Sequence, residues 1–181
     1  MKKFIVLTIL LIITRYTDLQ TTYFSTPDLK TEANPLVSLI GFGWVGLIIT
    51  QIVFLALLVY ALWVYSFKTV RTSPVSKGVP LNKFISLFYF DEPGSLFKII
   101  YKLPTNKNSL LFSLGYIFTY TIITWGFIVS LSTFLLLINK SYRDFYISNQ
   151  LWVYLYIIGI ALFIFFLIKF FRNEYAKRME M

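Results

Sequence analysis

The chain has 181 residues, of which 57% are hydrophobic, 20% aromatic and only 14% charged. Soluble domains carry about 25% charged residues, and a mean hydropathy of +0.71 indicates an integral membrane protein instead. The net charge of +9 is attributed to membrane topology rather than to nucleic-acid binding. The sequence contains no cysteine and no histidine, which excludes disulfides, thiol catalysis, Cys/His zinc sites and histidine acid–base chemistry.

Four apolar segments are long enough to cross a hydrocarbon layer of about 30 Å, which takes about 20 helical residues. They cover about residues 4–24, 36–65, 110–138 and 151–171. The second and third segments exceed the required length, so we expect them to tilt or to protrude from the membrane. The sequence therefore predicts one all-α domain, an integral membrane protein with four transmembrane helices.

The first segment has two interpretations. Lys2 and Lys3 followed by an apolar stretch are typical of a secretory signal peptide, but cleavage requires small residues. Neither alanine nor glycine occurs before Ala33, so we expect this segment to stay as a membrane helix. The alternative is cleavage, which would leave three spans and remove Arg15 and Asp18.

Polar side chains follow one face of the second half of this helix. At 100° per residue, the stripe consists of Thr14, Arg15, Asp18, Thr21, Thr22 and Ser25. Arg15 and Asp18 are i,i+3 neighbours and can form an ion pair. A single ion near the bilayer centre costs about 2.5–3.5 kcal/mol. We therefore expect the stripe to face other helices or a wet cavity.

Lysine and arginine residues are distributed unevenly between the connecting segments. Most lie at the N-terminus, in the loop of about residues 68–108 and from residue 169 onward, whereas the other two loops carry few. Because cytoplasmic loops of membrane proteins are rich in positive charge, we expect both termini inside (N-in, C-in). The predicted location is the plasma (inner) membrane, with the polar stripe in its outer half.

The long cytoplasmic loop, about 68–108, mixes apolar residues with lysines around a break at Pro93 and Gly94. This composition predicts segments that lie in the cytoplasmic interface, where Lys98 and Lys102 would attract anionic lipid. A docking site for a cytosolic protein partner is the alternative.

Small and hydroxyl residues mark faces of the second and third spans. Such residues let membrane helices approach closely and form hydrogen bonds between them. We expect the first three helices to form the core, and the fourth, which has almost no polar face, to lie at the lipid-facing periphery. The predicted helix-packing residues are Gly43, Gly46 and Thr50 on the second span, and Gly115, Thr119, Gly126 and Ser130 on the third.

Two short patterns lie near the second span. Asn34 and Pro35 predict its start, since asparagine caps helices and proline suits the first helical position. Gly41–Gly46 matches G-x-G-x-x-G, but a dinucleotide site also needs a preceding strand and a βαβ unit. We therefore interpret these glycines as helix-packing residues, and we expect Gln51 to form an interhelical hydrogen bond.

The region from Asp18 through Thr22 to Glu32-Ala33-Asn34-Pro35-Leu36 is similar to an uncharacterised family of small bacterial integral membrane proteins. These share an aspartate-bearing first helix and an E-x-N-P motif at the start of the second. The resemblance covers about residues 15–50 and implies a topology but no activity. It also implies that Asp18, Glu32 and Asn34 belong to one constellation near the outer surface. With Arg15 and Thr22 from the polar stripe, the candidate polar constellation is Arg15, Asp18, Thr22, Glu32 and Asn34.

Two hypotheses of function follow. The first is a non-enzymatic multi-pass protein that acts through helix packing and through lipid or a membrane or cytosolic protein partner. It needs no catalytic residue, cofactor or metal. The second is a small transporter or ion-pathway protein in which Asp18 binds a proton or cation and Arg15 tunes it.

Overall fold

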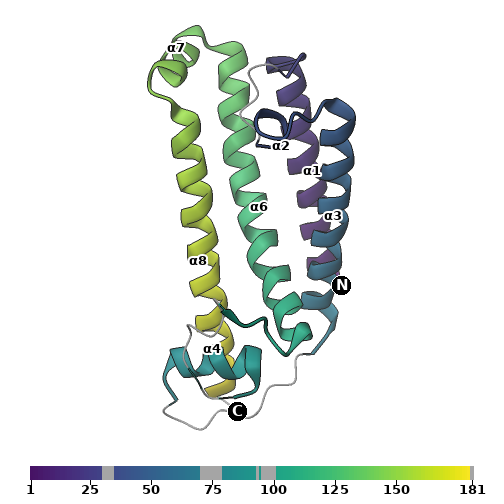
Figure 1. Cartoon of the computed structure of the whole chain (residues 1–181), viewed down its shortest axis with the longest axis vertical. Coiled ribbons are helices and arrows are strands. Elements are labelled where there is room, and N and C mark those ends of the chain that lie inside the picture. The colour runs from purple at the N-terminus through teal and green to yellow at the C-terminus, as the bar shows by residue number, and fades with distance from the viewer. Residues whose placement is uncertain (30–34, 70–78, 93, 95–100, 180–181) are drawn as a thin grey trace.

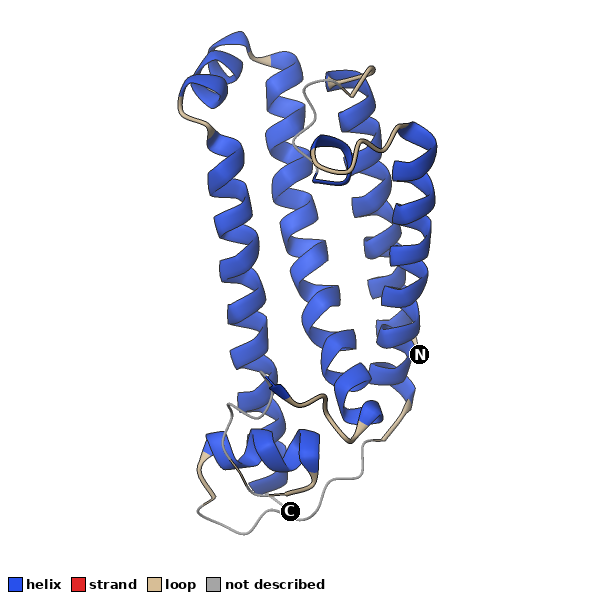
Figure 2. Ribbon diagram, in the orientation of Figure 1, coloured by secondary structure: helices blue, strands red, loops and turns tan. Residues whose placement is uncertain are grey.

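The computed structural model describes residues 1–29, 35–69, 79–92, 94 and 101–179, and within these ranges it contains helices and no strands (Figure 2). Four helices are long and apolar enough to cross a membrane, and they run side by side (Figure 1). They are α1 (Lys2–Ser25), α3 (Trp44–Phe67), α6 (Lys107–Ile138) and α8 (Leu151–Met179). The prediction of an all-α chain with four long apolar helices is confirmed.

The second apolar segment is interrupted rather than continuous. A short helix, α2 (Pro35–Ser38), comes first, and α3 begins only at Trp44. Between them Gly41 has a φ of 77°, a left-handed conformation that glycine adopts without a steric penalty. The predicted continuous span of 36–65 is therefore wrong at its start. Hydropathy missed the break because the residues around it are themselves apolar.

α6 is the central helix of the bundle, with α1 and α3 packed on one side and α8 on the other (Figure 1). It packs tightly on α3 at Gly115, where a Cβ atom would overlap the backbone carbonyl of Ala61. Its approach to α1 is close at Gly126, where a Cβ atom would lie 2.7 Å from Nη2 of Arg15. Small residues let membrane helices pack at such distances.

An apolar cluster fills one half of the space between α1, α3 and α6. Its buried members are Leu7, Leu11, Leu58, Leu62, Ile122 and Ile123. The leucines belong to the first half of α1 and the second half of α3, and the two isoleucines to the middle of α6, so the cluster extends from the middle of the bundle toward the end where α1 begins. This half is closed by side-chain packing.

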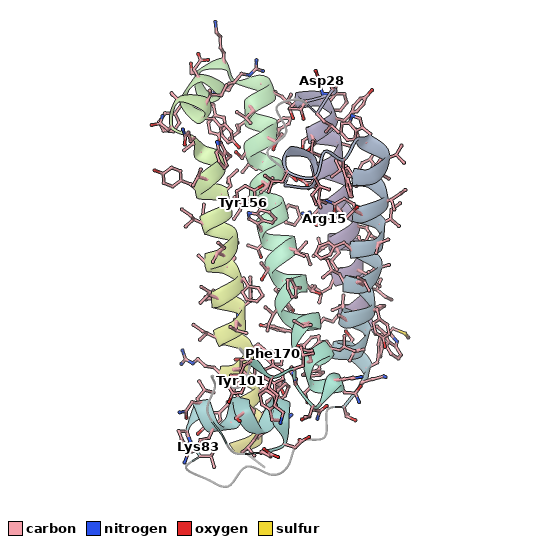
Figure 3. All side chains as sticks on the ribbon, viewed as in Figure 1. Arg15, Asp28, Lys83, Tyr101, Tyr156 and Phe170 are labelled. Atoms are coloured by element: carbon pink, nitrogen blue, oxygen red, sulfur yellow. The ribbon has the colours of Figure 1, made fainter. Side chains whose placement is uncertain are left out.

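Beyond this cluster, α4 (Leu81–Phe90) lies across the end of the bundle against α6 and α8 (Figure 1). Phe88 is fully buried, and its ring centroid lies 5.8 Å from that of Phe170, a residue marked at this end in Figure 3. The Tyr89 hydroxyl lies 2.8 Å from Oγ of Ser113 on α6. The first segment of the predicted interfacial loop is thus a helix whose apolar face packs on protein. Most of the second segment, including Lys98, lies outside the described residues.

A short helix, α7 (Lys140–Ser148), connects α6 to α8 at the opposite end (Figure 1). Asn139 begins it, because its side-chain oxygen accepts a hydrogen bond from the Tyr142 amide at 2.9 Å. α8 then returns along α6, and the Trp125 indole donates a hydrogen bond to the Leu155 carbonyl at 2.9 Å. The prediction placed α8 at the periphery, and α8 does pack mainly on α6, although its last turns also contact α4.

Candidate functional site

A cavity of about 1380 Å³ lies at the α7 end of the bundle, where α1 and α3 face α8 across α6. Its lining residues come from the second half of α1, the first turns of α3, the second half of α6, α7 and the start of α8. Leu36 and Leu39, from α2 and the turn after it, also contribute. The cavity therefore occupies the half of the bundle that the apolar cluster leaves open.

One wall of the cavity is polar. α1 contributes Arg15, Asp18, Thr22 and Ser25, Thr26 follows directly after the helix, and α3 contributes Thr50 and Gln51. The α1 residues are spaced three or four positions apart up to Ser25, which is the spacing of a single helix face. Arg15 is the residue of this wall nearest the apolar cluster, so it marks the inner end of the cavity.

The ion pair at this inner end is largely buried. Nη1 of Arg15 lies 3.3 Å from Oδ2 of Asp18, and the whole arginine residue is 8% exposed. Gly126 makes room for the guanidinium, since any larger residue would collide with it. Between the two charged residues in the sequence, Oγ1 of Thr17 lies 3.1 Å from Oγ of Ser130, a contact that links α1 to α6.

Two polar atoms near the cavity have no hydrogen-bond partner among the described residues. They are Nε of Arg15 and Oε1 of Gln51, both of them buried. A guanidinium carries five N–H donors, and a buried polar group without a partner costs about 1–3 kcal/mol. Both atoms are buried away from the cavity space, so any capacity to bind an acceptor there comes from the other N–H groups of Arg15, whose side chain lines the cavity.

The opposite wall is mainly apolar and aromatic. Trp152, Leu155 and Tyr156 of α8 form it, and Trp125 of α6 lies beside them. Arg15 and Tyr156 lie at about the same height on the two sides of α6 (Figure 3). A molecule in the cavity would thus contact polar groups on one side and rings on the other.

A second arginine lines the cavity from α7. Nε of Arg143 donates a hydrogen bond to the Leu136 carbonyl at 3.0 Å. Among the described residues, the charged ones that line the cavity are Arg15, Arg143 and Asp18, which leave an excess of one positive charge. Within the described ranges, no three acidic residues lie together as a metal site would require.

The structure brings together only part of the predicted constellation. Arg15, Asp18 and Thr22 line the cavity, whereas Glu32 and Asn34 lie outside the described residues.

The predicted helix-packing residues divide into two groups. On α6, Gly115 contacts α3, and Gly126 and Ser130 contact α1, while Thr119 is fully buried. On the α3 side the contacts differ from the expectation. A Cβ at Gly43 would meet nothing within 4 Å, and one at Gly46 would meet only the Phe42 side chain. Thr50 donates its hydroxyl to the Gly46 carbonyl of its own helix. The reason is the break at Gly41, which leaves this end of α3 beside the cavity.

Sequence reasoning missed Trp125, Arg143 and Tyr156 as cavity residues. The indole of Trp125 was a usable signal, because an N–H group inside an apolar helix needs an acceptor on a neighbouring helix. The sequence around Arg143 gave no such signal, because the polar residues of α7 are typical of an ordinary connecting loop.

No family model, curated protein or solved structure matches this chain. The resemblance over about residues 15–50 stays a prediction, and function is inferred from the cavity itself.

Proposed function

We propose that this chain is a non-enzymatic, multi-pass protein of the plasma membrane that binds a ligand in the cavity at its α7 end. The observation that carries the proposal is the buried guanidinium of Arg15. It lines the inner end of the cavity and pairs with Asp18 through Nη1 at 3.3 Å, which leaves most of its five N–H donors outside that pair. An acceptor on a ligand would bind the N–H groups of Arg15 that face the cavity through charge-assisted hydrogen bonds.

The distribution of charge supports an outward-facing cavity. α1 begins and α8 ends toward the α4 end of the bundle (Figure 1). The exposed lysines Lys2, Lys3, Lys68, Lys83 and Lys177 lie toward that same end. Because positive charge accumulates on the cytoplasmic side, we assign the α4 end to the cytoplasm. The cavity then opens in the outer half of the membrane.

The apolar cluster supports binding rather than conduction. Leu11 and Leu62 are fully buried on the cytoplasmic side of Arg15, and no charged residue belongs to the cluster. An ion would have to cross this packed region without partners, which is costly in a low-dielectric interior. The cavity is therefore a site with one open side.

Transport is the second candidate, because Asp18 lies in a cavity that reaches the middle of α1. Substrate sites of membrane transporters commonly lie near the bilayer midplane. Transport would require the cluster around Leu11 and Leu62 to open on the cytoplasmic side.

A comparison of co-purified molecules tests the binding proposal. Val129 lines the cavity, so Val129→Trp should fill it, whereas Ile160→Trp adds the same ring to an exposed position on α8. We expect mass spectrometry of solvent extracts to find a small molecule with the wild type and with Ile160→Trp, and not with Val129→Trp. Identical extracts from all three proteins would contradict binding in the cavity.

A flux measurement separates the two candidates. We expect wild-type vesicles to show no proton or sodium flux above empty vesicles, and Asp18→Asn to lower the folded yield. A wild-type flux that Asp18→Asn abolishes at normal yield would replace the binding proposal with transport.

A further inference from the structure

We infer that the ligand is an amphiphilic anion, with an oxyanion group that pairs with Arg15 and an apolar body that lies along the wall formed by α8. The inference deepens the proposed function and rests on it. It follows from three properties of the cavity: its charge, the chemistry of its two walls, and the distance between its arginines.

The charge of the cavity favours an anion. Among the described residues of the lining, Arg15, Arg143 and Asp18 leave one positive charge in excess, which a ligand with one negative charge would neutralise. A carboxylate or phosphate oxygen is also the acceptor that a guanidinium binds most strongly, because its planar fork can donate two parallel hydrogen bonds. A cation would instead add to this excess, because Asp18 is the one negative residue among the described residues of the lining.

The two walls favour an amphiphile over a small ion such as phosphate. The α1 wall presents hydroxyl groups, among them those of Thr22 and Ser25, whereas Trp152, Leu155 and Tyr156 present apolar surface. Pockets for drug-sized molecules usually enclose about 300–1000 Å³, so 1380 Å³ leaves room for a long chain or several rings. A small ion would leave the α8 wall bare.

The spacing of the arginines indicates that a single anionic group binds at Arg15 and not between the two. Arg15 contacts α6 at Gly126, and Arg143 contacts it at the Leu136 carbonyl, ten residues further along. At 1.5 Å per residue this is roughly 15 Å, which is too far for one carboxylate or phosphate to bridge. Arg143 lies nearer the α7 end of the cavity, where its charge would attract the anion.

Three probes of matched structure test the inference on the full chain in phosphatidylcholine nanodiscs. Dodecyl phosphate carries both an oxyanion and a chain, dodecanol keeps the chain alone, and inorganic phosphate keeps the anion alone. Calorimetric titration, corrected with empty nanodiscs, gives the affinities. We expect dodecyl phosphate to bind at least about tenfold more tightly than dodecanol, and inorganic phosphate not to bind at concentrations that saturate the dodecyl phosphate site.

Three variants test whether Arg15 causes the preference for dodecyl phosphate over dodecanol. Arg15→Gln/Asp18→Asn removes both charges at once, so no unpaired ion remains, and it should bind dodecyl phosphate no better than dodecanol. Arg172→Gln removes the same charge from an exposed position on α8 outside the cavity and should behave as wild type. Arg15→Lys keeps the charge without the planar fork, should retain part of the preference, and serves as the test if the double variant does not fold.

The outcomes are distinguishable from failure of the proposed function. Equal binding of dodecanol and dodecyl phosphate would overturn the anion inference and leave a cavity that binds apolar molecules. If inorganic phosphate binds as tightly as dodecyl phosphate, the ligand does not need an apolar body. This result would overturn the inference of an amphiphile and indicate a soluble anion. If the double variant still prefers dodecyl phosphate to dodecanol as strongly as the wild type does, the role of Arg15 is overturned. If the double variant does not fold, the same result in Arg15→Lys overturns it. Binding of none of the three probes would contradict the proposed function itself.

Discussion

The two ends of the bundle hold α6 in place by different means. At the α4 end, rings from α4 and α8 surround Phe88, which is fully buried, and none of these rings lines the cavity at the other end. At the α7 end, α6 is held to α1 by the Thr17–Ser130 hydrogen bond and lies beside the Arg15–Asp18 ion pair, next to a cavity of about 1380 Å³. Aromatic packing fills the space between helices, whereas single polar contacts leave it open. The α4 end should therefore supply stability and the α7 end binding.

The largest effect is expected from Phe88→Ala. Removing a fully buried ring costs about 3–5 kcal/mol in free energy of unfolding, because lost contacts add to the cavity left behind. Denaturant unfolding in mixed micelles measures it. Phe134→Ala, at a half-exposed position on α6, is the control and should cost far less. Equal losses in the two variants would show that the rings around Phe88 do not hold the helices together.

Gly115→Ala should come next, at about 3 kcal/mol, the upper end of the usual cost of overpacking. Its new Cβ would collide with the Ala61 backbone, which cannot rotate away as a side chain can. Gly43→Ala adds the same methyl group in open space and should cost less than about 1 kcal/mol. Both are read from the same unfolding curves. A tolerated Gly115→Ala would mean that α3 and α6 lie further apart.

Asp18→Asn should cost about 2 kcal/mol, because it leaves the Arg15 charge buried without its partner. Adding Arg15→Gln should recover most of this loss, since the double variant contains no unpaired ion. The four proteins form a double-mutant cycle whose coupling energy is the quantity of interest. Additive losses would indicate that the two charges do not interact.

Ser130→Ala should have the smallest effect, about 0.6 kcal/mol, the average for a hydrogen bond between membrane helices. It removes the contact with Thr17 at 3.1 Å. Thr133→Val is the control, because the Thr133 hydroxyl donates a hydrogen bond to the Val129 carbonyl of its own helix. A larger loss in the control would mean that Ser130 does not link α1 to α6.

Hydropathy predicted the long helices well but not where the chain turns. Runs of apolar residues identify α1, α6 and α8 because each helix is apolar over most of its length. The same signal joined α2 to α3, since a break at Gly41 changes backbone direction without changing polarity. It also gave no sign of α7, whose polar residues resemble an ordinary loop.

The candidate site was predictable on one side only. Helical spacing places Arg15, Asp18 and Thr22 on one face of α1 without knowledge of any neighbour. The residues opposite, such as Trp125 and Tyr156, depend on how α6 and α8 are rotated against α1. One sequence does not determine that rotation, because apolar helices carry little periodic signal of the face they bury.

Thiol labelling of single-cysteine variants tests the central claim most directly, because the chain has no cysteine of its own. Thr22→Cys places the thiol in the cavity wall, and Lys83→Cys places it on the exposed face of α4. With a membrane-impermeant reagent, we expect Thr22→Cys to be labelled in intact cells and Lys83→Cys only after permeabilisation. Labelling of Lys83→Cys in intact cells, or failure to label Thr22→Cys from outside, would contradict an outward-facing cavity.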